Sequence, residues 1–388
     1  MVDRGHAPAT QGILTTLLTG NGPNQLPTAT NPRPKVGIIE GTGIGPEVIG
    51  AALRVLANVE QVIGIRFDVR HSGGCAGEAE DQPGWSLPDP LVAFCAGILD
   101  GGGAILNGPV GGRYVYELRR RFDLFCKFVP VRPWPQLAGA TRIAAPHLQD
   151  ADLLIVRDNA GGVYQGRWRD RVTAEGRVAE HSFSYSESQV RRLAEVAARA
   201  AARRRGRLHV IVKRGGVPGI SALWRDAGLA AAREHHVRAT LMNIDLAAYE
   251  LIQHPGQFDV LAAPNLFGDI LADIAGALLG SRGVTFSGNF NTRGQAVYQT
   301  NHGCAHDLAG ADTANPAGQI LSLAMLLRES FGLEEAAALI EAALAEAWCQ
   351  GWRTPDLAEP GCRVVGTRAM AERVGEQVLR LAEEQQHA

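Results

Sequence analysis

The amino-acid sequence predicts an α/β fold, because short apolar runs of strand length alternate along the chain with stretches of helical periodicity. Residues 35–40 form one such run, which leads through a glycine turn at residues 41–46 into helical spacing over 47–59. Residues 258–263 form another and lead into the segment 265–273. With 388 residues the chain exceeds the usual size of one domain, so we expect two domains or one large α/β unit.

The remaining elements repeat this order of strand, loop and helix. Strands are predicted at 101–106, 152–157, 208–213 and 237–245, and helices at 116–125, 186–203 with Ser186 as N-cap, 247–252, 317–327, 333–348 and 367–384. Two of the strands end on a cationic side chain, Arg157 and Lys213. Open α/β sheets place their ligands at such strand ends, so we expect functional residues there.

The glycine turn at 41–46 superficially resembles a dinucleotide-binding fingerprint. Pro46 stands where the last glycine of that fingerprint should be, and no acidic residue is evident at a second strand end about 20 residues further on. The turn therefore gives little support for a Rossmann fold.

Asp269 and Asp273 are four residues apart, so on a helix they lie one turn apart on the same face. Apolar residues flank them, which predicts that the two carboxylates lie against packed surface. Two like charges in that setting are costly unless a metal ion or a cationic substrate neutralises them. The alternative interpretation is a helix start, where the helix dipole favours aspartate.

Composition narrows the class of protein. The net charge is −2 and the basic residues are scattered, so the sequence lacks the electrostatic footprint of a nucleic-acid-binding protein. The six cysteines lie far apart without a CxxC pair, which favours reduced thiols in a cytoplasmic protein.

Residues 1–33 are rich in Pro, Thr, Asn and Gly and lack a long apolar segment. We therefore expect a poorly ordered or peripheral extension there and no contact with a membrane.

Taken together, the motifs resemble those of the isocitrate/3-isopropylmalate dehydrogenase family, the metal-dependent β-decarboxylating dehydrogenases. The resemblance runs from about Lys35 to the C-terminus and rests on the order and spacing of four motifs. These are Asn-Leu-Phe-Gly-Asp-Ile-Leu-Ala-Asp at 265–273, His-Gly-Cys-Ala-His-Asp-Leu-Ala-Gly at 302–310 with Asn315-Pro316, and the loops that carry Tyr164 and Lys213.

The resemblance implies a large mixed sheet of about a dozen strands in two domains, which is not a Rossmann fold. Residues 34–124 plus 277–388 would form the first, cofactor-binding domain, and residues 125–276 the second, which carries the dimer interface and the metal site. It also implies a homodimer, in which Lys213 and Asp245 of one subunit complete the active site of the other.

The resemblance assigns roles to single residues of this chain. Asp269 and Asp273 match two metal-binding aspartates of one subunit, and Asp245 matches the one contributed across the interface. An all-oxygen site favours Mg²⁺ or Mn²⁺ over zinc. Lys213 matches the lysine that takes the proton of the substrate hydroxyl, and Tyr164 the tyrosine that protonates the enol after decarboxylation.

Cofactor binding is implied at two loops. The loop from His302 and Gly303 matches the adenosine-binding loop, Asn315 would contact the adenine, and Asn107, Gly111 and Gly112 belong to the loop at the nicotinamide end. Asp307 stands where NAD-using members carry an acidic residue that can accept from the ribose hydroxyls. A carboxylate would repel the 2′-phosphate of NADP, so we expect NAD as the cofactor.

The substrate site departs from the family pattern. Arg119 and Arg157 match two of the three arginines that usually hold the malate portion, but Val129 stands where the third should precede Pro130. The loss removes a charge-assisted contact worth roughly 1.5–3 kcal/mol. The consequence is either a substrate that lacks this carboxylate or a replacement cation nearby, for which Lys127, Arg132 and Arg113 are the candidates. Three further positions also differ: Thr42 replaces an aspartate, Gly215 an asparagine and Gln299 a glutamate.

From these residues we expect NAD-dependent oxidative decarboxylation of a 2-hydroxy acid similar to 3-isopropylmalate or isocitrate, with a modified substrate. One alternative is oxidation of a related hydroxy acid without decarboxylation. Another is a non-catalytic regulatory subunit, but such a chain has no need of Lys213, Tyr164 and three metal-binding aspartates together.

Overall fold

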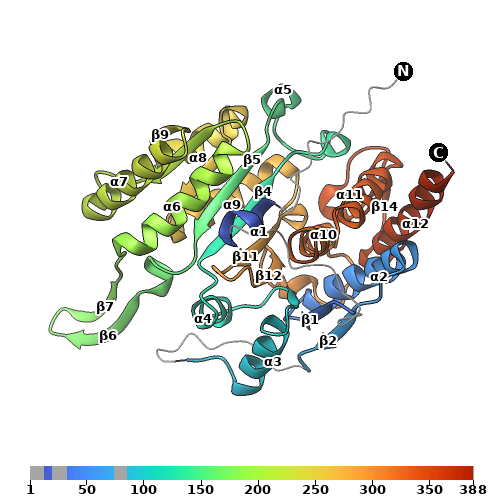
Figure 1. Cartoon of the computed structure of the whole chain (residues 1–388), viewed down its shortest axis with the longest axis horizontal. Coiled ribbons are helices and arrows are strands. Elements are labelled where there is room, and N and C mark those ends of the chain that lie inside the picture. Colours follow the sequence, from blue (N-terminus) through green and yellow to red (C-terminus); the bar gives the residue numbers. More distant parts are fainter. Residues whose placement is uncertain (1–12, 20–32, 74–84, 388) are drawn as a thin grey trace.

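The computed structural model describes residues 13–19, 33–73 and 85–387, and this part of the chain is built on a ten-stranded sheet (Figure 1). Across the sheet the strands are β2 (Asp68–His71), β1 (Lys35–Ile39), β3 (Ala104–Asn107), β12 (Ala296–Thr300), β11 (Phe286–Phe290), β4 (Cys126–Val131), β5 (Leu153–Asp158), β10 (Val260–Ala263), β8 (Arg207–Val212) and β9 (Arg238–Asn243). β11 is antiparallel to both β12 and β4, β4 is antiparallel to β5, and the other neighbours are parallel. The predicted α/β fold with a large mixed sheet is confirmed.

The strand order separates the sheet into two halves. β2, β1, β3, β12 and β11 come from the segments 34–124 and 277–388, whereas β4, β5, β10, β8 and β9 come from 125–276. The two halves meet where β11 pairs with β4, with Asn289 opposite Lys127. These are the segments that we assigned to two domains, and the division into domains itself stays a prediction.

Two smaller sheets lie outside the main one. β6 (Arg167–Thr173) and β7 (Gly176–Ser182) form an antiparallel hairpin that extends away from the rest of the chain (Figure 1), and β13 (Trp352–Arg353) pairs with β14 (Arg363–Val364).

Helices connect the strands. They are α1 (Ile13–Thr19), α2 (Gly45–Ile63), α3 (Asp89–Leu99), α4 (Tyr114–Arg121), α5 (Ala145–Leu148), α6 (Glu187–Ala202), α7 (Pro218–Glu234), α8 (Ile244–Gln253), α9 (Asn265–Gly276), α10 (Ala317–Phe331), α11 (Glu334–Cys349) and α12 (Thr367–Gln386), with short 3₁₀ turns that include η2 (Val163–Gln165), η5 (Arg282–Val284) and η6 (His306–Leu308). Within the described residues, no helix has the length and apolar character needed to span a bilayer.

The predicted cap of α6 is confirmed in detail. The Ser186 hydroxyl accepts a hydrogen bond from the Gln189 backbone N–H at 3.2 Å, and the Gln189 side chain accepts one from the Ser186 N–H at 3.0 Å. This reciprocal capping box satisfies two backbone donors at the helix start. The prediction at 237–245 was wrong at its end, because β9 stops at Asn243 and Asp245 lies in the first turn of α8.

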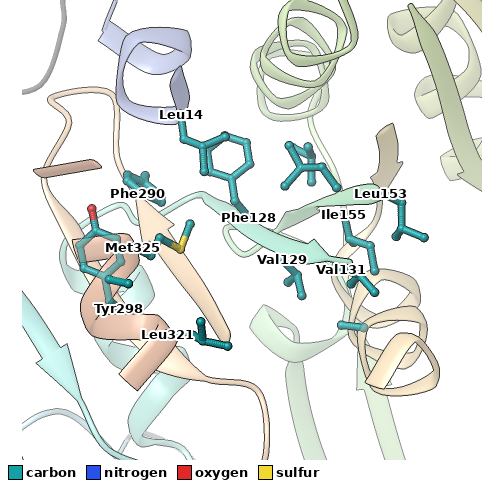
Figure 2. Packing of buried hydrophobic residues seen from close by; sticks show 14 of the residues in the cluster. Leu14, Phe128, Val129, Val131, Leu153, Ile155, Phe290, Tyr298, Leu321 and Met325 are labelled. Atoms are coloured by element: carbon teal, nitrogen blue, oxygen red, sulfur yellow. The ribbon is translucent and has the colours of Figure 1, made fainter. Parts of the chain in front are cut away.

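The core lies where α10 covers the sheet. All fifteen residues of α10 are buried, and the helix packs against β12, β11, β3, α2 and α11. Phe128 on β4 meets Phe290 on β11 edge-to-face, with ring centroids 5.4 Å apart. Figure 2 shows Phe128 on one face of β4 and Val129 with Val131 on the other. A strand alternates its side chains in this way, so the two faces of β4 serve different surroundings.

α1 lies within the stretch that we expected to be a poorly ordered or peripheral extension. It packs against α6 and α10 with Leu14 and Leu17 buried. The N–H groups of Leu14 and Thr15 donate to Glu329 Oε2 at 3.0 and 3.3 Å, and the Thr15 hydroxyl donates to the Glu329 carbonyl oxygen at 2.7 Å. This segment is therefore part of the core, while residues 1–12 and 20–32 lie outside the described residues.

The docking of α1 on Glu329 predicts a pH dependence of stability. Burial raises the pKa of Glu329 to about 8, although the N–H groups of α1 and the Arg328 guanidinium oppose the rise. In the unfolded chain Glu329 has its lower, ordinary pKa and releases its proton above it, whereas the folded chain keeps the proton. The free energy of unfolding therefore falls as pH rises from 5 to 8, by about 1.4 kcal/mol for each pH unit between the two pKa values. The urea midpoint of the wild type should fall between pH 5 and 9, and that of Glu329→Gln should fall less. Parallel curves would contradict this; Glu383→Gln, at an exposed position, is the control.

Candidate active site

Arg157, at the end of β5, is the centre of a buried polar cluster, and its side chain is 2% exposed. Its Nε and Nη2 donate to Asn265 Oδ1 at 3.2 and 2.9 Å, and its Nη1 pairs with Asp269 Oδ1. Helix α9 can lie directly over the guanidinium because residue 268 is glycine. A Cβ at Gly268 would stand 2.7 Å from Arg157 Cγ, a distance that real Cβ contacts do not show.

Tyr164 joins this cluster from the turn η2. Its hydroxyl donates to Asp269 Oδ2 at 2.8 Å, so the two carboxylate oxygens of Asp269 are shared between Tyr164 and Arg157. Burial, and then the hydrogen bond to the Asp269 carboxylate, raise the pKa of Tyr164 well above its ordinary value. Burial also acts to raise the pKa of Asp269, but Arg157, Lys127, Tyr164 and Arg119 together outweigh it and hold that pKa below the ordinary value. Asp269 is therefore ionised and Tyr164 protonated at neutral pH.

Asp273 lies one turn further along α9, as its spacing from Asp269 predicts. It pairs with Arg282 of η5, Nη2 to Oδ2 at 3.0 Å. Partial burial, with the nearby Asp269 charge, raises the pKa of Asp273 despite this partner. The side chain is exposed, which differs from the packed setting that we expected. No feature of the sequence indicated Arg282 as its partner.

Lys213 and Asp245 form a pair of their own. Lys213 Nζ lies 2.8 Å from Asp245 Oδ1, and this hydrogen bond holds the pKa of Asp245 below its ordinary value. Lys213 follows β8, which β10 separates from β5 and Arg157. Within the described part of the chain, no three His, Cys, Asp or Glu side chains gather as a metal site, so Asp245 does not join Asp269 and Asp273 here.

Arg119 and Tyr116 bring α4 to the cluster. Arg119 is 5% exposed, and its Nε is buried without a hydrogen-bond partner among the described residues. Burial and the nearby Arg157 charge lower the pKa of Arg119 to about 9. Its guanidinium lies 5.9 Å from the centre of the Tyr116 ring, and the Tyr116 and Tyr164 rings are 5.1 Å apart. The two predicted substrate arginines therefore lie together with Tyr164.

Three loops meet on the other half of the sheet. The Thr42 N–H donates to the Pro109 carbonyl at 2.8 Å, and the Ile44 N–H donates to the Cys304 carbonyl at 2.9 Å. Gly43, with φ of +60°, makes the approach possible, because a Cβ there would stand 2.1 Å from the Cys304 carbonyl oxygen. The turn 41–46, the loop 107–112 and the loop 302–310 thus form one surface. No local feature of the sequence links the turn 41–46 to the two predicted cofactor loops.

The predicted cofactor residues differ in how free they are to bind a ligand. His302 Nε2 is buried without a partner among the described residues, and burial lowers the pKa of this imidazole. Asp307 is exposed on η6, and a Cβ at Gly303 would meet no atom within 4 Å. Gly111 leaves space next to Cys304 Sγ, at 3.7 Å from a Cβ placed there, and Gly112 has φ of +61°.

Two other predicted cofactor residues use their side chains inside the protein. The Asn107 amide donates to the Gly108 carbonyl at 2.9 Å and accepts from the Tyr114 hydroxyl at 3.1 Å. The Asn315 amide donates to Asp356 Oδ2 at 3.0 Å and accepts from the Ala317 N–H at 2.9 Å. These side chains fix the loop 107–112 and the start of α10.

The donor chemistry fits the groups that the resemblance implies. Asp269 and Asp273 offer carboxylate oxygens, the ligand type that Mg²⁺ and Mn²⁺ prefer, and both already attract positive charge, from Arg157 and Arg282. The unpartnered His302 Nε2 and the open space at Gly303 fit a polar ligand at the loop 302–310.

Comparisons with known proteins identify the family of this chain. The family described as isocitrate/isopropylmalate dehydrogenase matches residues 35–374. A 3-isopropylmalate dehydrogenase from Aquifex aeolicus is 34% identical over 363 residues, which cover 89% of this chain and 98% of that protein. One from Nitrosomonas europaea is 38% identical over 352 residues, 88% and 98% of the two chains. The crystal structure of isocitrate dehydrogenase from Methylococcus capsulatus has a TM-score of 0.77 and 30% identity, and the match covers 89% of this chain and 99% of that one. The chain therefore belongs to the isocitrate/isopropylmalate dehydrogenase family.

Proposed function

We propose that the protein catalyses the NAD-dependent oxidative decarboxylation of a 2-hydroxy acid similar to 3-isopropylmalate or isocitrate, with Mg²⁺ or Mn²⁺. The observation that carries the proposal is the hydrogen-bonded series Arg157–Asp269–Tyr164. It joins an anion-binding group, a carboxylate of the type that binds such metals, and a proton donor in one cluster. The family membership and the relatives named 3-isopropylmalate dehydrogenase support the reaction class.

Each step of this reaction has a residue of suitable chemistry. Arg119 and Arg157 bind a substrate carboxylate, and Lys213 takes the proton of the substrate hydroxyl. After CO₂ has left, Tyr164 donates its proton to the enol carbon. A bound divalent ion would lower the pKa of the substrate hydroxyl, and NAD would accept the hydride. The raised pKa of Tyr164 keeps the proton on the phenol until the reaction needs it.

The complete site is proposed to form between two copies of the chain. Asp269 and Asp273 would hold the metal from one copy, and Asp245 from the other. The position of Lys213 and Asp245 supports this arrangement. Lys213 directly follows β8 and Asp245 lies in the first turn of α8, so the pair is away from the Arg157 cluster and accessible to a second chain. The protein would then act as a homodimer in the cytoplasm.

Two features support the cofactor and substrate assignments. Asp307 is exposed on the loop 302–310, where its carboxylate can accept from ribose hydroxyls but would repel a 2′-phosphate, which supports NAD. Val129 is buried in the apolar core at the position where the family usually has an arginine, which supports a modified substrate. Asn107, Gly111, Gly112, Gly303 and Asn315 would shape the cofactor site.

A substrate panel tests the proposed reaction. Isocitrate, 3-isopropylmalate, D-malate, tartrate and homoisocitrate are each incubated with NAD and Mn²⁺, and NADH and CO₂ are both measured. We expect one CO₂ for each NADH with at least one malate-type acid, and weak turnover of isocitrate and 3-isopropylmalate. NADH without CO₂ would contradict decarboxylation, and vigorous turnover of either of these two acids would contradict a modified substrate.

Removal of the proton donor should lower kcat with little effect on KM. Tyr164→Phe keeps the ring and leaves Asp269 paired with Arg157, so the change removes a proton and not the site. We expect kcat to fall about 100-fold, the usual contribution of a general acid. Lys213→Met, which removes the proposed base, should have a loss of similar size. An unchanged kcat in either variant would show that the residue has been given the wrong role.

Cofactor preference should depend on the charge at position 307. Asp307→Lys is expected to lower kcat/KM with NAD and raise it with NADP, so that the ratio of the two changes about 10-fold or more, equivalent to 1.4 kcal/mol. Asp226→Lys, which makes the same charge change at an exposed position on α7, is the control. The assignment of Asp307 to the ribose is wrong if both variants keep the wild-type ratio.

A further inference from the structure

Lys127 is a buried cation whose position the proposed reaction does not yet explain. It lies on β4, directly opposite Arg157 on β5 and Asn289 on β11. Directly opposed residues of antiparallel strands point to the same face of the sheet, with Cβ atoms about 4.5–5.5 Å apart. The side chain is 3% exposed. Lys127 therefore lies beside the guanidinium at the centre of the active-site cluster.

Two like charges directly opposed on neighbouring strands are destabilising unless an anion lies between them. Asp269 and Asp273 contribute negative charge near Lys127, but the Asp269 oxygens are hydrogen-bonded to Arg157 and Tyr164, and Asp273 pairs with Arg282. Among the residues that the structure describes, the Lys127 ammonium has no hydrogen-bond or ion-pair partner, and Arg119 Nε also has none. Burial, Arg119 and Arg157 lower the pKa of Lys127 far below its ordinary value, although the Asp269 and Asp273 charges oppose this shift. The cluster has an excess of positive charge that an anionic ligand would balance.

The residue type is unusual for this chain. Of its 38 basic residues, three are lysines: Lys35, Lys127 and Lys213. Arginine supplies nearly every other positive charge, so an ammonium at position 127 is not explained by general composition. An ammonium is a compact point charge, whereas guanidinium is a planar fork, and the two select different ligand geometries.

The other two candidate replacements for the missing arginine are placed differently. The Arg113 guanidinium donates to the Tyr164 carbonyl at 3.0 Å and lies between the Tyr116 and Trp168 rings, 5.0 and 4.8 Å from their centres. Arg132 is exposed and follows Val131, at the far end of the β4–β5 ladder. It is five residues from Lys127, which is about 17 Å along an extended strand.

Val129 shares the face of β4 that Lys127 occupies, because the two are two residues apart. We propose that Lys127 binds the second carboxylate of a malate-type substrate, in place of the arginine that Val129 replaces, and so determines which substrate the enzyme accepts. The proposal rests on the proposed function for the class of substrate. The anionic group would lie about 7 Å along β4 from position 129, beside Arg157 and not over the apolar core.

Direct binding of two small probes tests this role without turnover. D-malate and D-lactate share the hydroxyl and the adjoining carboxylate, and D-malate alone has a second carboxylate. Isothermal titration calorimetry with the full chain at fixed Mn²⁺ gives the Kd of each. We expect the wild type to bind D-malate at least about 10-fold more tightly than D-lactate, as a charge-assisted contact implies. Lys127→Met should abolish this preference and leave the D-lactate Kd unchanged.

Matched variants separate a substrate contact from a structural role. Arg132→Met should keep the wild-type preference. Lys127→Met should have a melting temperature no lower than the wild type, because the change removes an unpaired buried charge; Lys127→Gln gives the same test if the methionine variant does not fold. Lys127→Arg should not restore the preference, since a planar fork does not replace a point charge beside Arg157.

The binding test of Lys127 and the test of the proposed reaction can fail separately. A preference for D-malate that survives in Lys127→Met, or a wild type that does not distinguish the two acids, would overturn the role of Lys127. If instead the preference depends on Lys127 but no 2-hydroxy acid yields NADH and CO₂, the proposed reaction fails and the assignment of Lys127 stands.

Discussion

The buried guanidinium of Arg157 is the group on which the site depends. Its hydrogen bonds to Asn265 and its ion pair with Asp269 attach α9 to the end of β5. Removing Asp269 would take a counter-charge from a buried guanidinium, which is destabilising, and the 40% exposure of the Asp269 side chain reduces the size of this effect through solvent screening. The absence of a side chain at Gly268 is what allows the helix to approach. The position of α9 and much of the ionisation of Asp269 depend on this contact, whereas burial and the Asp269 carboxylate keep Tyr164 protonated.

Around the contact of Arg157 with Asp269, cationic side chains outnumber anionic ones. Arg119, Lys127 and Arg157 come from α4, β4 and β5, and Asp269 neutralises one of them. A binding site with this balance selects for anions, and the strength of the selection grows where water is excluded. The two aspartates of α9 provide a place for a cation next to it. An acid that carries both a hydroxyl and carboxylates suits both parts of the site.

Much of this arrangement could be predicted from the sequence, because it depends on residues that lie close together along the chain. The strand ends that carry Arg157 and Lys213, the spacing of Asp269 and Asp273 and the cap at Ser186 are all short-range features. The family resemblance supplied the mixed sheet, since the pairing of β11 with β4 joins segments about 160 residues apart, for which local periodicity gives no rule.

What could not be predicted depends on long-range contacts. The polar composition of residues 1–33 did not indicate the short helix α1. The helix packs next to Glu329, which is more than 300 residues away in the sequence. The contact between the turn 41–46 and the loop 302–310 is of the same kind, and it includes a hydrogen bond from the Thr42 hydroxyl to Cys304 Sγ. The hydrogen bonds that Asn107 and Asn315 make inside the protein could not be predicted either. An asparagine that binds a cofactor and an asparagine that fixes a loop look the same in the sequence.

The shared active site is tested most directly by mixing two inactive variants. Tyr164→Phe and Lys213→Met are combined under conditions that exchange subunits, and exchange is verified by mass spectrometry. If Lys213 serves the neighbouring copy, each mixed dimer contains one intact site, and about a quarter of wild-type activity should return after random exchange. If Lys213 and Tyr164 act within one chain, every site in the mixed dimers lacks one of them, and no activity would return.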